Sequence, residues 1–194
     1  EDRAALYRNL GDFRFERVAI PVLSEYAREP KKFGLPSGGV LADYDNDGET
    51  DLLVTFAFGA CRLFRNDGDL RFVEADAGLD AHSVSLAANF FDFDRDGDLD
   101  LFVANALPPY LPDYERPTKL NVFDLPQPEY PGDRRMFRFM HNGWHNADNG
   151  GRNVLYRNLG NGRFEAVDVG MTETHWSLAV GTGDFNRDGW TDLY

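Results

Sequence analysis

The nine residues from Asp43 to Asp51 decide the fold, and they read DYDNDGETD. Aspartates stand at positions 1, 3 and 5 of this stretch, glycine stands at position 6, and a further aspartate closes it at position 9. The pattern returns at 92–100 as DFDRDGDLD and at 184–192 as DFNRDGWTD. Three copies of one loop indicate a repeat architecture, because self-similarity at a fixed spacing is its main sequence signature.

A second motif alternates with the Asp-rich loop. It has two apolar or aromatic residues, then Arg-Asn, then a turn with glycine and an aromatic residue six positions after the asparagine. The copies are LYRN at 6–9 with Phe15, LFRN at 63–66 with Phe72, and LYRN at 155–158 with Phe164. Apolar residues on both sides of such a turn predict a β-hairpin.

The spacing of the two motifs predicts an all-β chain built as a β-propeller. Asp43 and Asp92 are 49 residues apart, and four strands fit into the first complete unit, at 39–44, 51–56, 61–66 and 71–75. Four strands in 40–50 residues are typical of a propeller blade. Closed propellers have about four to eight blades. Residues 1–194 are therefore expected to be a partial propeller of about three four-stranded blades, a piece of a larger protein. It divides into an outer hairpin (5–19), a complete blade (37–79), a blade (84–169) with an insert (105–152), and an inner hairpin (176–194).

The Asp-rich loops have the chemistry of a calcium site. Calcium takes six to eight oxygen ligands, and glycine at position 6 allows the sharp turn that brings alternate carboxylates together. A backbone carbonyl at position 7 can add another oxygen. The predicted ligands are Asp43, Asp45, Asp47, the carbonyl of Glu49 and Asp51; Asp92, Asp94, Asp96, the carbonyl of Asp98 and Asp100; and Asp184, Asn186, Asp188, the carbonyl of Trp190 and Asp192.

Two other interpretations of these loops fit the sequence less well. An EF-hand requires glutamate at position 12, where this chain has Val54 and Val103, and its flanks are helical rather than rich in strand residues. Solvated Asp-Gly turns are common. However, the repeated clustering of carboxylates without a cation would be costly through like-charge repulsion. The pattern therefore favours metal binding.

Composition narrows the possible partners. The formal net charge is −13, which argues against nucleic acid, because binding phosphate needs a basic surface. No apolar run is long enough to span a bilayer, so membrane insertion is not expected. Cys61 is the only cysteine, which excludes an internal disulfide framework.

The two motifs together resemble the FG-GAP/VCBS repeat of integrin-α-like propellers. More narrowly, LYRNLGNGRF at 155–164 followed by DFNRDGW at 184–190 resembles the cartilage-acidic-protein-like family, whose members often carry an ASPIC/UnbV module. The resemblance implies a secreted, seven-bladed, calcium-stabilised propeller without catalysis of its own, located outside the cell, on its surface or in the periplasm. The function predicted is a non-enzymatic binding or scaffold module, for example in cell adhesion, with a protein or glycan ligand. A lectin, a glycan lyase and an accessory domain of a larger enzyme remain alternatives.

The insert at 105–152 begins rich in proline and continues with aromatic residues and histidines. Long loops on rigid scaffolds often carry function, and His141, His145 and Asp148 could form a metal or catalytic cluster beside a sugar-stacking Trp144. A packed Ω-loop whose aromatic side chains cover the blade edge is the favoured interpretation. Because the insert joins the second and third strands of its blade, strand direction places it on the face opposite the Asp-rich loops.

Overall fold

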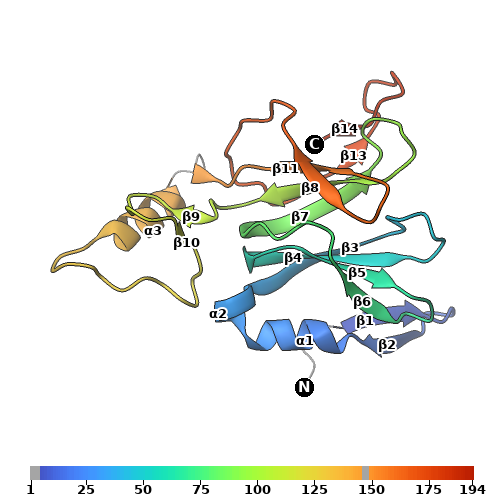
Figure 1. The fold of residues 1–194 in the computed structure, drawn as a ribbon, viewed down its shortest axis with the longest axis horizontal. Coiled ribbons are helices and arrows are strands. Elements are labelled where there is room, and N and C mark those ends of the chain that lie inside the picture. The colour runs from blue at the N-terminus through green and yellow to red at the C-terminus, as the bar shows by residue number, and fades with distance from the viewer. Residues whose placement is uncertain (1–4, 146–148) are drawn as a thin grey trace.

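The computed structural model describes residues 5–145 and 149–194, with residues 142–145 described by their backbone alone. The chain is mostly β-structure, with helices at one end and in the insert (Figure 1). The strands are β1 (Ala5–Asn9), β2 (Phe15–Ala19), β3 (Leu35–Ala42), β4 (Asp51–Gly59), β5 (Arg62–Asn66), β6 (Phe72–Ala75), β7 (Ser83–Phe91), β8 (Asp100–Asn105), β9 (Tyr110–Leu111), β10 (Thr118–Lys119), β11 (Val154–Asn158), β12 (Phe164–Val167), β13 (Thr182–Gly183) and β14 (Asp192–Leu193). The helices are α1 (Pro21–Arg28), α2 (Pro30–Phe33) and α3 (Arg135–His145).

Two four-stranded antiparallel units form the centre of the molecule. In the first unit β3, β4, β5 and β6 pair in chain order, and in the second β7, β8, β11 and β12 do the same. The units are joined where the end of β4 pairs with the start of β7, at Ala57↔Val84 and Gly59↔Ser83. The result is one open, curled antiparallel sheet, flanked by the β1–β2 and β13–β14 hairpins. This arrangement confirms the predicted all-β fold, a partial β-propeller.

Strand β4 shows how the blades build their core. Its side chains alternate between two apolar clusters: Leu53 packs with Leu63, Leu101 and Val103 toward the second unit, while Phe56 packs with α1 on the other side. Because both faces of the strand are covered, nearly every residue of the strand is buried. The sequence therefore shows a continuous apolar run at this point rather than alternating apolar and polar residues.

The first strand of the complete blade differs from its predicted range. The structure places β3 at Leu35–Ala42, four residues earlier at its start than the predicted 39–44. Tyr44 belongs to the loop, and its ring is buried between the two units, 5.9 Å from the ring centre of Phe164. An aromatic residue next to a strand was thus mistaken for part of it, because burial alone does not distinguish the two.

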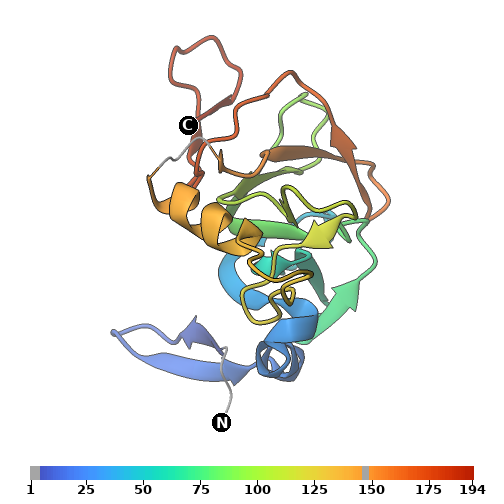
Figure 2. The same cartoon turned by 90° about the vertical axis from the view of Figure 1, so that its left-hand side faces the viewer.

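The insert is a packed substructure rather than an Ω-loop without secondary structure. It contains the short β9–β10 pair and α3, and Figure 2 shows α3 lying across the ends of the central strands. Leu111, Leu120 and Phe139 form a buried cluster with Val84 of β7. In Figure 1 the insert projects from one end of the strands, and the β3–β4 and β7–β8 loops lie at the other end. The predicted placement on the opposite face is therefore confirmed.

The lengths of the helices determine whether any of them could span a membrane. Within the described parts of the chain α3 is the longest helix, at 11 residues, and no helix there is long and apolar enough to cross a membrane.

Candidate metal centre

Each of the three Asp-rich loops closes through the same hydrogen bond. The carboxylate at position 9 accepts the backbone N–H of position 2, so the end of the loop holds its beginning. The three donor–acceptor pairs are Tyr44–Asp51 at 3.2 Å, Phe93–Asp100 at 3.0 Å and Phe185–Asp192 at 2.8 Å. In each case the first strand ends just before the loop and the second strand begins at the last residue of the loop, so this bond fixes the turn between two paired strands.

The carboxylate at position 1 organises the other half of the loop. Asp43 accepts the N–H groups of Asp47 (3.1 Å) and Gly48 (3.0 Å), and Asp184 does the same for the matching residues of the third loop. In the second loop Asp92 accepts the N–H of Gly97 at 3.2 Å. Positions 4 and 6 have positive φ throughout, and glycine at position 6 adopts this conformation without steric cost.

The first two loops bring three carboxylates together. Ligand atoms of Asp43, Asp45 and Asp51 lie within 4.8 Å of one another, and so do those of Asp92, Asp94 and Asp100. These two groups could hold a metal ion. The position-9 members are buried, Asp51 with 1% and Asp100 with 0% of its surface exposed.

One oxygen in each group has no hydrogen-bond partner among the residues that the structure describes. These oxygens, Asp45 Oδ1 and Asp92 Oδ1, are both buried. Buried polar atoms are almost always hydrogen-bonded, and an orphaned carboxylate oxygen beside two other carboxylates is especially unfavourable. A hard cation with oxygen ligands is the group that would satisfy such an atom. The residues therefore fit a calcium ion.

Burial also perturbs the titration of these groups. It raises the pKa of Asp51 and of Asp100 above the ordinary value for aspartate, although backbone N–H donors partly oppose the change. The pKa of Asp45 is raised by burial first and by the neighbouring Asp47 second. A nearby opposite charge favours the ionised form of a carboxylate. A bound cation would therefore favour the ionised carboxylates and lower the pKa values that burial raises.

The other predicted ligands are arranged differently. Asp47 and Asp96 are exposed, lie outside the two carboxylate groups, and accept the N–H groups of Glu49 and Asp98. Ligation by the position-7 carbonyls of Glu49, Asp98 and Trp190 stays a prediction.

The third loop has the same backbone bonds but a more open set of side chains. Asp184, Asn186 and Asp188 are exposed, Asp192 is half-buried, and Asn186 donates to Asp188 at 2.9 Å. The four residues belong to neither of the two three-carboxylate groups found in the described chain.

The asparagines of the second motif contact the Asp-rich loops, which the sequence did not predict. Asn66 donates its backbone N–H to Asp51, and Asn158 donates its own to Asp100, both across 2.8 Å. Both asparagines are buried. The repeated Arg-Asn pair was the available signal, but it was interpreted only as part of a hairpin.

The structure describes the side chain of only one member of the possible metal or catalytic cluster in the insert, His141. His141 stacks on Phe137, with ring centres 5.9 Å apart and planes 6° from parallel. The side chains of Trp144 and His145, and the whole of Asp148, lie outside the described residues.

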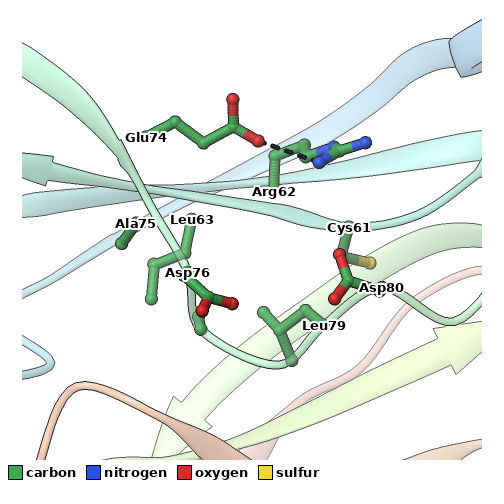
Figure 3. Close-up of a pocket in the computed structure, with 9 residues that line it drawn as sticks. Cys61, Arg62, Leu63, Glu74, Ala75, Asp76, Leu79 and Asp80 are labelled. Atoms are coloured by element: carbon green, nitrogen blue, oxygen red, sulfur yellow. Dashed lines mark hydrogen bonds and ion pairs between the residues drawn. The ribbon is translucent and has the colours of Figure 1, made fainter.

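A pocket of about 310 Å³ lies along β5 and β6 (Figure 3). Its wall carries an ion pair between Arg62 and Glu74, with 2.9 Å between nitrogen and oxygen, and Asp76 pairs with Arg163 at 2.8 Å. Cys61 is buried at its edge, and burial raises the pKa of the thiol, which favours the protonated form. The first ion pair lies between the neighbouring strands β5 and β6, and the second joins residues of the two units that lie outside the strands.

Fold and loops together define a partial β-propeller whose blades carry carboxylate clusters at one end. The chain matches the FG-GAP-like repeat family over residues 43–103 and 144–194, more than half of its length, and it belongs to that family. Both matched segments contain Asp-rich loops: the first two loops lie in one and the third lies in the other. No curated protein matches the chain.

Proposed function

We propose that this protein is a calcium-binding propeller that acts as a non-enzymatic binding or scaffold module outside the cell, on its surface or in the periplasm. The observation that carries the proposal is the pair of orphaned oxygens, Asp45 Oδ1 and Asp92 Oδ1, each buried within a group of three carboxylates. A cation at each position satisfies the oxygen and offsets the mutual repulsion of the carboxylates.

Calcium fits these loops better than the softer transition metals. The side chains that converge are carboxylates, and hard oxygen ligands suit calcium or magnesium, whereas zinc and copper favour nitrogen and sulfur. In the first loop Asp43, Asp45 and Asp51 would hold the ion, and in the second Asp92, Asp94 and Asp100. Asp184, Asn186, Asp188 and Asp192 would form a third, more exposed site. The ion supplies positive charge that keeps each turn rigid.

The proposed scaffold role, the proposed location outside the cytoplasm and the proposed ligand are supported by the FG-GAP-like family and by the resemblance of the motifs to other propellers. FG-GAP-like repeats form propellers typical of extracellular proteins, and the second motif resembles the cartilage-acidic-protein-like group. The ligand would be a protein or a glycan, bound to a propeller that the metal loops stabilise. A glycan array tests the alternative of a carbohydrate-binding or carbohydrate-active propeller. Retained glycan favours a lectin, and cleavage products favour a lyase.

Calcium binding is tested by titration of the chelator-treated full chain, with calorimetry and thermal unfolding measured on the same samples. Affinities in the range of extracellular modules, roughly 10⁻⁴–10⁻³ M, are expected. At a hundredfold excess over Kd, each site adds roughly 2.7 kcal/mol to the free energy of unfolding. Magnesium is expected to stabilise less, because it demands near-octahedral geometry and gives up water reluctantly.

A matched pair of variants tests the assignment of the site. Asp94→Asn removes one carboxylate from the second group, and Asp69→Asn makes the same change in an exposed hairpin turn with positive φ, a conformation that asparagine tolerates. Calcium should raise the melting temperatures of the wild type and of Asp69→Asn by the same amount. It should raise the melting temperature of Asp94→Asn by less. A melting temperature that calcium leaves unchanged in the wild type would refute the proposed function.

A further inference from the structure

The Asp-rich loops of neighbouring blades are in direct contact. Asn46, at position 4 of the first loop, donates a side-chain hydrogen bond to Oδ1 of Asp98, at position 7 of the second loop, across 2.9 Å. Arg95, at position 4 of the second loop, lies over the ring of Trp190, at position 7 of the third, 3.9 Å from its centre. The two contacts differ in chemistry but join the same two positions.

Position 4 has the same backbone conformation in both contacting loops. Asn46 and Arg95 have φ of 59° and 64°, so the backbone at both positions is left-handed. The Arg95 side chain also lies against the turn of the third loop: a Cβ on Gly189 would come within 2.7 Å of Arg95 Nη2. The second loop thus covers the glycine at position 6 of the third loop.

A buried residue joins the first two loops from beneath. Asn158, with 4% of its surface exposed, donates its backbone N–H to Asp100 and its side-chain amide to the carbonyls of Leu99 (3.0 Å) and Tyr44 (2.8 Å). Leu99 and Asp100 belong to the second loop, and Tyr44 belongs to the first. One side chain therefore holds both loops, and a shift of either loop would strain its hydrogen bonds.

We propose that the loops bind calcium as a coupled row rather than as independent sites, with Asn46 and Asn158 linking the first loop to the second and Arg95 linking the second to the third. This inference rests on the proposed function. A metal ion that orders one loop also fixes the residues with which the next loop is in contact, so the next ion binds with less loss of conformational entropy. The coupling is reciprocal, because it is a free energy shared by two sites.

Hydrogen exchange followed by mass spectrometry tests the coupling, since it reports protection of each loop separately as calcium is titrated. Asp94→Asn weakens calcium binding at the second loop. It should therefore raise the midpoint of the first loop, which is the calcium concentration at which the loop is half protected, by about fivefold, the lower end of the range usual for coupling between sites. Asn46→Gly keeps the left-handed backbone and removes the side-chain hydrogen bond to Asp98. When Asp94→Asn is introduced into the Asn46→Gly variant, the rise in the midpoint of the first loop should therefore be smaller.

The matched control is Arg187→Gly, which makes the same type of change at position 4 of the third loop, where φ is 65°. It should leave the effect of Asp94→Asn on the first loop intact. A midpoint of the first loop that does not respond to Asp94→Asn would overturn the coupling while calcium binding stands. A response equally large with Asn46→Gly and with Arg187→Gly would overturn the role of Asn46 in the coupling. Absence of calcium-dependent protection at every loop would instead count against the proposed function.

Discussion

The backbone N–H of Asn66 donates a hydrogen bond to Asp51 across 2.8 Å, and this bond joins the two motifs of one repeat. Asp51 closes the Asp-rich loop, and Asn66 ends the strand that precedes the hairpin turn. The second unit repeats the relationship between Asp100 and Asn158 at the same distance. Because one motif supplies the acceptor and the other the donor, the two motifs recur together at a fixed order along the chain.

This relationship predicts that Asp51 matters to folding even without metal. Asp51→Ala would leave two backbone donors, those of Asn66 and Tyr44, without their acceptor. An unsatisfied buried donor costs about 1–3 kcal/mol, so the two donors together cost roughly 2–6 kcal/mol of the free energy of unfolding. Relief of charge repulsion among the carboxylates lowers the expected loss to roughly 2–4 kcal/mol. Urea unfolding in excess chelator measures it. Asp47→Ala, in the exposed part of the same loop, is the control, and an equal loss in both variants would contradict the assignment.

The repeats made the blades predictable, because each strand pair and each turn has a second copy in register. The segment between Ile20 and Leu35 has no such copy, and its two helices were not predicted. Each of them begins at a proline, Pro21 and Pro30, a residue favoured in the first helical turn. The stretch is short, and its helical conformation depends on packing of Leu23 against β4, which only the folded chain reveals.

The position of α2 leads to a second stability prediction. A Cβ on Gly59 would lie 1.9 Å from the carbonyl oxygen of Phe33, so α2 approaches β4 too closely for any side chain there. Gly59→Ala should therefore lower the free energy of unfolding by about 3 kcal/mol, the upper end of the usual range for overpacking. Gly181→Ala is the control, because its Cβ would meet nothing within 4 Å. Similar midpoints in urea for the two variants would show that the strand can move away.

The clustering of carboxylates was predictable in part, but the connections between the loops were not. The spacing of aspartates in 43–51 and 92–100 indicated that carboxylates converge there, and three of the four predicted in each loop do so, whereas Asp47 and Asp96 lie outside the groups. The bond from Asn158 to the carbonyl of Tyr44 joins residues 114 positions apart, across two blades. No local pattern specifies such a contact, which depends on how adjacent blades stack.

Burial of Cys61 predicts slow thiol chemistry. The side chain is 7% exposed, and burial raises its pKa, so both the access of a reagent and the thiolate fraction are reduced. Ellman's reagent should react with the folded chain on the order of a hundredfold more slowly than with the chain in urea, since reaction requires local opening. The control is Cys61→Ser combined with Val73→Cys, which moves the thiol to an exposed position of β6. Equal rates for the two folded proteins would show that β5 opens readily.

The helix in the insert was missed for a different reason. Met136 and Phe139, three residues apart, pack into the buried cluster beside β7, as expected for one face of a helix. The preceding prolines led to the interpretation of the whole segment as a loop. The spacing of Met136 and Phe139 is the local signal in the sequence for this helix.

Arg135 is expected to hold the insert together. It is 8% exposed, pairs with Asp133 (2.6 Å) and Glu129 (2.7 Å), and lies over the ring of Tyr114, 4.0 Å from its centre. Arg135→Ala should therefore increase hydrogen exchange and proteolysis across residues 113–135. Arg134→Ala, an exposed neighbour with the same charge, is the control and should behave like the wild type.

The pH dependence of this effect follows from the same contacts. Hydrogen bonds from Arg135 hold the pKa of Asp133 well below its usual value, so the pair stabilises the folded insert above the unfolded pKa of about 3.9 and loses that contribution as the pH falls further. The wild type should therefore loosen across 113–135 only in acid, whereas Arg135→Ala should already be loose at pH 7 and change less. Because the insert and the Asp-rich loops lie at opposite ends of the strands, calcium protection of 43–51 should be the same in both proteins at pH 7. A loss of that protection in Arg135→Ala would mean that the insert and the metal loops are not independent.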